Sequence, residues 1–219
     1  MPFTDAFPKI PSYRRLPPPC RTTPTDRVAA VALGAFILGA GFVTMRILDL
    51  KVYHNKWSVY CHLTTWTTLI VGAFFLGVGF TGWNPQTIAA AIGYLAMFVL
   101  IMRLLYFEYD FTDWFSAYKE IFAHLLVPII MIVWLSARQV NYSVGENAWR
   151  WKSVLIFVSL IVAWFILNLI LRKIRGKWVY GRDAADPGTT KGRMQAVAGL
   201  MVAGLCIAFV QLVVVQPCM

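Results

Sequence analysis

The amino-acid sequence predicts an all-α, polytopic membrane protein built as a bundle of six transmembrane helices. The first observation is composition: 59% of the residues are hydrophobic and 14% are charged, against about 45–50% apolar and about 25% charged in an average soluble domain. So little charge would leave a soluble particle short of hydrated surface, so lipid must cover much of the chain. The second observation is that the apolar residues form six stretches of about 20 residues, the length that a helix needs to cross a bilayer.

The six predicted spans are separated by short polar segments. They are Val28–Ile47, Ser58–Phe80, Gln86–Tyr106, Ser116–Leu135, Ser153–Leu171 and Met194–Val215. Tryptophans near the predicted ends are typical of the aromatic belts at membrane interfaces; they are Trp57, Trp83, Trp114, Trp149, Trp151 and Trp178. Pro128 falls inside the fourth span and is expected to kink it, because proline lacks the N–H that a helix interior requires.

Glycines in the first two spans are small enough to allow close helix contact, as in other membrane bundles. They are Gly34, Gly39 and Gly41 in the first span and Gly72, Gly77 and Gly79 in the second. Glycines that merely reflect bilayer composition are an equally good reading. The sequence therefore predicts, as one of two readings, that the first two helices pack against each other.

Three segments divide the chain: a Pro- and Arg-rich arm at 1–27, a transmembrane domain at 28–215 and a short tail at 216–219. An arm of this composition does not form a core of its own, so it is expected to be extended and docked on another chain or on lipid headgroups. Membrane lipids, and other membrane subunits held through the arm, are the predicted partners.

The net charge of +10 is explained by basic loops that lie beside anionic lipid headgroups. Eight of the 20 Lys and Arg residues fall on the side of the N-terminus and twelve on the other side, which favours a cytosolic or matrix location for the first, third and fifth loops. No nucleic-acid-binding motif is present. The organelle stays open among the mitochondrial inner membrane, the endoplasmic reticulum and the plasma membrane.

Polar residues inside a span are costly, so each one suggests a function. They concentrate in two segments, Tyr60–Thr68 at the start of the second span and Lys119–Pro128 in the fourth. Both spans are even-numbered and start from the same face of the membrane. Thr64 lies six residues past the predicted start of its span and His124 eight, which places both roughly 9–12 Å from the helix starts.

A hydroxyl and an imidazole at matched depth can form a nucleophile–base pair. Glu120 lies one helical turn before His124, where it can orient the imidazole and complete a triad-like set. The predicted catalytic residues are therefore Thr64, His124 and Glu120. Structural readings of the same residues are a threonine bonded back to its own helix and a histidine that bridges two helices.

Other functions are weaker alternatives. His62 and His124 could serve as axial haem ligands, but no second histidine pair supports that pattern. Arg103 joins His62, Glu120 and His124 as an intramembrane ionisable residue of the kind that transporters use, yet no inverted repeat is visible. The four cysteines show neither a CxxC pair nor metal-ligand spacing. No cofactor and no metal are predicted.

Three segments resemble the androgen-induced and androgen-dependent TFPI-regulating membrane proteins and their bacterial and invertebrate relatives. They are Lys56-Trp57 with Leu63-Thr64 and Ala73–Gly77, His124 followed by Pro128, and Gly176–Tyr180. The resemblance implies a six-helix hydrolase of fatty acid esters of hydroxy fatty acids, with Thr64 as nucleophile and His124 as base. Thr67 and Gly181 depart from that family's pattern, at positions where an acidic residue and a proline are expected. The alternative expectation is an inactive accessory subunit of a larger bioenergetic membrane complex.

Overall fold

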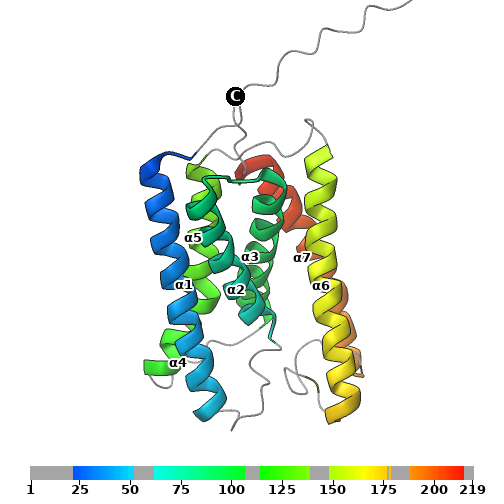
Figure 1. Ribbon diagram of the computed structural model, residues 1–219. Helices are drawn as coiled ribbons and strands as arrows, with labels where there is room; N and C mark the ends of the chain where they lie inside the picture. The colour runs from blue at the N-terminus through cyan, green and yellow to red at the C-terminus, as the bar shows by residue number, and fades with distance from the viewer. Residues whose placement is uncertain are drawn as a thin grey trace, which may run out of the picture.

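The computed structural model describes residues 22–51, 62–106, 114–138, 148–176, 178 and 188–214. Within these ranges the secondary structure is helical, and six helices are long and apolar enough to cross a membrane. The six-span, all-α prediction is confirmed, and the chain is an integral multi-pass membrane protein. The helices stand side by side as one bundle (Figure 1).

The first, second, third and fifth crossings are each made by one uninterrupted helix: α1 (Pro24–Lys51), α2 (Leu63–Thr81), α3 (Gln86–Tyr106) and α6 (Ala148–Arg175). The fourth crossing consists of α4 (Trp114–Lys119), a π-helix η2 (Glu120–Leu126) and α5 (Val127–Ala137). The sixth crossing is α7 (Thr190–Phe209), which continues into a short π-helix, η3 (Val210–Val214).

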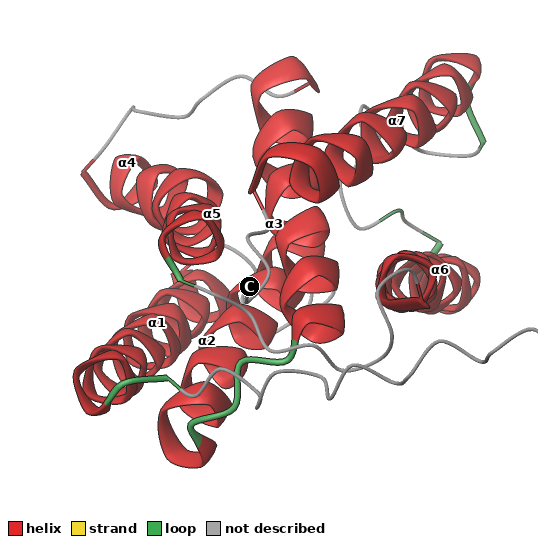
Figure 2. Ribbon diagram, turned by 90° about the horizontal axis from the view of Figure 1, so that it is seen from above, coloured by secondary structure: helices red, strands yellow, loops and turns green. Residues whose placement is uncertain are grey.

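Helix α3 is the centre of the bundle. It contacts α2, α5, α6 and α7, whereas α1 packs chiefly along α2. Seen from above, α3 stands between the group formed by α1, α2, α4 and α5 and the outlying pair α6 and α7 (Figure 2). The core of α3 is built from small and aromatic side chains that are fully buried, among them Ala89, Ala91 and Tyr94. Small side chains let neighbouring backbones approach closely where lipid supplies no hydrophobic drive.

The glycines of α1 and α2 divide into two sets. A Cβ added at any of four glycines would come within 3 Å of atoms of the facing helix, so these positions carry the close contact between α1 and α2: Gly34, Gly41, Gly72 and Gly79. Gly39 and Gly77 have nothing within 4 Å and face away from it. The predicted packing of the first two helices is confirmed, and four of the six glycines that predicted it lie at the contact.

The fourth crossing changes from π-helix to α-helix close to Pro128. The segment before it is a π-helix in which the Val127 N–H donates to Phe122 O, five residues earlier. Pro128 is then the second residue of α5, in a first turn where a missing N–H is tolerated. The disturbance predicted at Pro128 therefore takes the form of seven residues of π-helix, Glu120–Leu126, that end two residues before the proline.

The predicted boundary between the arm and the transmembrane domain differs from the structure. Helix α1 begins at Pro24, four residues before the predicted domain start, because Thr23 and Asp26 cap it through reciprocal side-chain contacts. Arg27, assigned to the arm by sequence, donates to the carbonyls of Gly79 and Phe80 at the end of α2. Residues 1–21 of the predicted arm, and the tail at 216–219, lie outside the described residues.

The tryptophans predicted at the membrane interfaces differ in their exposure. Trp83, Trp114 and Trp151 are 41–78% exposed at helix ends, as interface residues are expected to be. Trp178 is only 5% exposed. It packs edge-on against Trp164 and Phe165 of α6 instead of facing the membrane interface. Its assignment to the aromatic belt was wrong, and Trp57 and Trp149 lie outside the residues whose side chains are described.

Candidate functional site

Thr64 is the second residue of α2, which begins at Leu63. The two threonines that follow one turn later donate to carbonyls of their own helix: Thr67 to Leu63 O at 3.0 Å and Thr68 to Thr64 O at 3.0 Å. This is the usual way to satisfy a hydroxyl in a membrane helix. Thr64 differs, because it is too close to the helix start for such a bond and its Oγ1 faces another helix.

His124 supplies the partner of that hydroxyl. Its Nε2 lies 3.1 Å from Thr64 Oγ1, within hydrogen-bond range. His124 comes from the π-helix η2, and short π segments inside α-helices are found frequently at functional sites. The side chain is 16% exposed. The pairing brings together two residues that sequence analysis placed on different spans.

Glu120 contacts the other ring nitrogen of His124. Its Oε2 lies 2.9 Å from His124 Nδ1, and its side chain is 3% exposed. The same oxygen lies 2.7 Å from the Arg103 guanidinium of α3, and Lys119 Nζ lies 3.4 Å from Oε1. Neither contact to Oε2 meets the geometry of a hydrogen bond, and the contact with His124 is an ion pair only when the imidazole is protonated. Catalytic contacts are often misaligned in this way until substrate binds.

The pattern of partners assigns the imidazole tautomer. An ionised carboxylate can only accept, so Glu120 favours a proton on Nδ1, and in the neutral imidazole this leaves a lone pair on Nε2. The hydroxyl of Thr64 then donates to Nε2. Histidine in this state is ready to take a proton from the threonine. The three predicted residues, Thr64, His124 and Glu120, therefore lie together in the order of a nucleophile, a base and an orienting acid.

The depth argument that linked these residues was partly wrong. It counted Thr64 from a helix start at Ser58, but α2 begins at Leu63, and residues 52–61 lie outside the described part of the chain. His124 lies deeper in its crossing, which begins at Trp114. The helices meet because the fourth crossing packs against α2 through η2, a relationship that counting from helix starts does not capture.

The site lines a cavity of about 870 Å³, near the upper end of the size range of ligand pockets. Thr64, Glu120 and His124 form part of its wall, and the rest is predominantly apolar. Phe98 and Met102 of α3, Phe157 and Ile161 of α6, and Gly199 and Ala203 of α7 all line it. The cavity therefore lies between the helices α1, α2 and η2 on one side and α6 and α7 on the other, with α3 forming part of its wall.

The cavity is open at its α6–α7 side. Val158 and Val162 of α6 and Leu200 of α7 line it, yet each is 44–73% exposed. Because both helices lie within the membrane-spanning length of the chain, this opening faces the region that lipid occupies. Trp178, which follows the end of α6, covers another part of the wall.

Sequence analysis missed the roles of Arg103 and Trp178. It recognised Arg103 as an intramembrane charge but did not connect it to Glu120. The available signal was that a buried carboxylate in a span needs a cation, and Arg103 is the only arginine within the third predicted span. For Trp178 the sequence carried no such signal, because a tryptophan just after a span usually marks the interface.

The geometry bears on the haem alternative as well. His62 lines the same cavity as His124, but both ring nitrogens of His124 face protein partners. An axial haem ligand needs one ring nitrogen for iron, so haem binding would break the pair with Thr64. Among the described residues no cluster of three or more His, Cys, Asp or Glu side chains could hold a metal ion.

Comparison with known proteins identifies no relative: no protein-family model, no curated protein and no solved structure matches the chain.

Proposed function

We propose that the protein is an intramembrane lipid-ester hydrolase in which Thr64 is the nucleophile, His124 the general base and Glu120 the orienting acid. The observation that carries the proposal is the continuous series of contacts from Glu120 through His124 to Thr64 on the wall of an apolar cavity. Thr64 bonds to another helix, whereas Thr67 and Thr68 bond back to their own, so the structural reading of Thr64 as a threonine bonded to its own helix does not apply.

The reaction proceeds in two stages. Thr64 Oγ1 attacks the ester carbonyl while its proton passes to His124 Nε2, and the tetrahedral intermediate then expels the alcohol, which takes that proton. Water next attacks the acyl-threonine, giving its proton to Nε2, and the fatty acid leaves as Thr64 Oγ1 recovers the proton. Glu120 stabilises the imidazolium that forms in each stage.

The start of α2 favours this chemistry electrostatically. Aligned peptide dipoles give a helix N-terminus a partial positive charge, which attenuates within about the first turn. Thr64 is the second residue of the helix, so negative charge developing on its oxygen or on the attacked carbonyl is stabilised. Arg103 and Lys119 add positive charge beside Glu120.

The cavity indicates the substrate class. Its wall is mostly aliphatic and aromatic, and it opens beside α6 and α7 within the membrane-spanning length. A lipid ester would enter sideways and place its acyl chains against α3, α6 and α7. Fatty acid esters of hydroxy fatty acids, the substrates that the family resemblance implies, have two such apolar parts on either side of one ester bond.

The experiment combines turnover with trapping of the intermediate. Purified protein in lipid nanodiscs is assayed with fatty acid esters of hydroxy fatty acids, and a hydroxyl-directed fluorophosphonate is used to label the nucleophile. We expect turnover and one labelled residue, Thr64, identified by peptide mass spectrometry. Thr65→Ala is the matched control and should hydrolyse and label as the wild type does. Turnover that persists in Thr64→Ala would refute the proposal.

A second candidate is an accessory subunit of a larger membrane complex. The observation that favours it is the wide exposed surface of α6 and α7. Only 17% of the apolar membrane-spanning stretch of α6, and 22% of that of α7, is buried inside the protein. Lipid or neighbouring subunits would cover that surface. Blue-native electrophoresis of gently solubilised membranes distinguishes the two, because a subunit migrates with a large complex and an independent enzyme migrates alone.

A further inference from the structure

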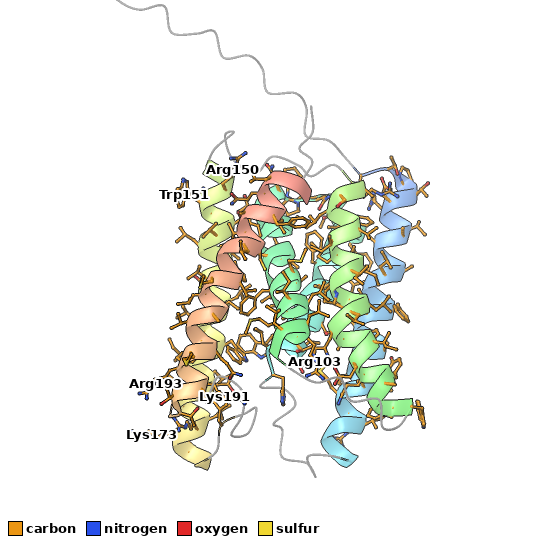
Figure 3. The ribbon with its side chains drawn as sticks, turned by 180° about the vertical axis from the view of Figure 1, so that it is seen from behind. Arg103, Arg150, Trp151, Lys173, Lys191 and Arg193 are labelled. Carbon is orange, nitrogen blue, oxygen red and sulfur yellow. The ribbon has the colours of Figure 1, made fainter. Side chains whose placement is uncertain are left out.

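The guanidinium of Arg103 and the imidazole of His124 share one oxygen atom. Both approach Glu120 Oε2, Arg103 at 2.7 Å and His124 Nδ1 at 2.9 Å. The arginine side chain is 12% exposed and that of Glu120 is 3% exposed. In Figure 3 Arg103 lies near the same end of the bundle as Lys173 and Lys191, away from Arg150 at the opposite end.

Burial makes this arginine necessary to the charge of Glu120. An ionised carboxylate is costly in a low-dielectric interior unless a cation and hydrogen-bond donors compensate it. Lys119 alone is a poor substitute, since it lies 3.4 Å from the other carboxylate oxygen and is 24% exposed. Without Arg103 the acid would be favoured in its protonated form.

Protonation of Glu120 would change the role of His124. A carboxylic acid can donate its O–H to Nδ1, and the ring proton then belongs on Nε2. In that tautomer Nε2 has no lone pair for the Thr64 hydroxyl, so the base is lost although every side chain keeps its place. The same fault accounts for the large loss when the triad aspartate of a serine protease is replaced by its amide.

We propose that Arg103 is a positioning residue that keeps Glu120 ionised and so holds His124 in the tautomer that accepts the Thr64 proton. The catalytic consequence rests on the proposed function, whereas the tautomer itself does not. Arg103 acts through Glu120 and His124 and takes no part in the covalent steps.

A rival role is possible for Arg103 because it also lines the cavity. An arginine that binds an anionic group of the substrate would act on affinity, and its removal would raise KM with kcat unchanged. An arginine that keeps the base in its working tautomer acts on the chemical step, and its removal lowers kcat. The split between kcat and KM therefore separates the two roles.

The kinetic experiment uses full-length protein in nanodiscs and the variants Arg103→Met, Glu120→Met and the double variant. We expect each single variant to lower kcat on the order of 10²-fold or more and to leave KM within about threefold. The double variant should be hardly worse than Glu120→Met, because residues that act as a unit are non-additive. Arg138→Met is the control: it removes an arginine that lies 2.8 Å from Asp26 at the other end of the bundle.

The second measurement is independent of turnover. Nitrogen-15 NMR of histidine-labelled protein, with the His124 signals assigned through His124→Gln, reports which ring nitrogen carries the proton. We expect Nδ1–H in the wild type and in Arg138→Met, and a shift toward Nε2–H in Arg103→Met. If Arg103→Met does not fold, the double variant is measured in its place, because it leaves no unpaired buried charge. Its tautomer is then compared with that of Glu120→Met.

The outcomes separate cleanly. An unchanged tautomer in folded Arg103→Met, a rise in KM alone, or a double variant tenfold worse than Glu120→Met would overturn the role of Arg103. A tautomer shift in a protein that hydrolyses no ester would support the role of Arg103 and refute the proposed function instead.

Discussion

Thr64 and His124 are 60 residues apart in the chain, yet Oγ1 of the threonine and Nε2 of the histidine are 3.1 Å apart. The contact joins the first turn of α2 to the π-helix of the fourth crossing. Glu120, one turn earlier on the same π-helix, holds the opposite ring nitrogen. The three separately predicted residues therefore form one series of contacts, in which a proton would pass from Thr64 to His124.

The first prediction concerns the non-additivity of that arrangement. Thr64→Ala and His124→Ala should each reduce ester hydrolysis by about 10²–10⁴-fold, and the double variant should lose hardly more, because the two residues act as a unit. The measurement is kcat/KM of the three variants on one lipid ester in nanodiscs. Losses that multiply in the double variant would mean that the two residues act independently.

The second prediction tests the cavity. Ala203 of α7 lines it, while the adjacent Gly204 has nothing within 4 Å of an added Cβ. Ala203→Trp should fill acyl-binding space and raise KM for long-chain esters much more than for short-chain ones. Gly204→Trp places the same side chain on the outer side of the helix and should leave KM for both kinds of ester unchanged. Chain-length profiles of the two variants provide the test, and identical profiles would place the acyl chains elsewhere.

The third prediction concerns the contact between α1 and α2. A Cβ at Gly34 would lie 2.8 Å from the backbone nitrogen of Leu76, so Gly34→Ala should destabilise the protein by about 1–3 kcal/mol, as overpacking does. Gly39 is on the same helix with open space around it. Gly39→Ala should be neutral or stabilising by up to about 1 kcal/mol, because alanine favours the helix.

Thermal unfolding in one detergent, followed by circular dichroism, compares these two variants with the wild type. Opposite signs of the Tm shift are expected. Equal shifts for Gly34→Ala and Gly39→Ala would show that the close contact is absent in the membrane protein.

The fourth prediction concerns a buried polar contact whose residues do not line the cavity. Tyr94 Oη of α3 lies 3.0 Å from Ser153 Oγ of α6 and accepts from Gln211 Nε2 of η3 at 2.9 Å. Tyr94→Phe should destabilise the bundle by about 0.5–2 kcal/mol, the range for hydrogen bonds between membrane helices, without altering turnover. Tyr118→Phe is the control, since Tyr118 contributes a ring stacked 5.6 Å from Phe122. A lower Tm in both variants alike would argue against the hydrogen bond as the cause.

The sequence by itself determined the fold class and the six crossings. Backbone N–H and C=O groups cannot stay unpaired in lipid, so each apolar stretch of sufficient length must become a helix. Every predicted span corresponds to an observed crossing, with ends that differ by a few residues where caps or a late start intervene, as at Pro24 and Leu63. The residue types of the candidate site were also visible, because polar groups inside a span are rare and costly.

Only the tertiary structure decided which of those polar groups meet. Hydropathy is a property of one segment, whereas a contact between helices depends on the rotation, register and neighbours of both. The sequence therefore could not show that Arg103 shares an oxygen of Glu120 with His124, that Gly34 faces α2 while Gly39 does not, or that Trp178 packs inward. Even the pairing of Thr64 with His124, which was predicted, comes from the packing of η2 against α2, because the helix starts from which their depths were counted were wrong.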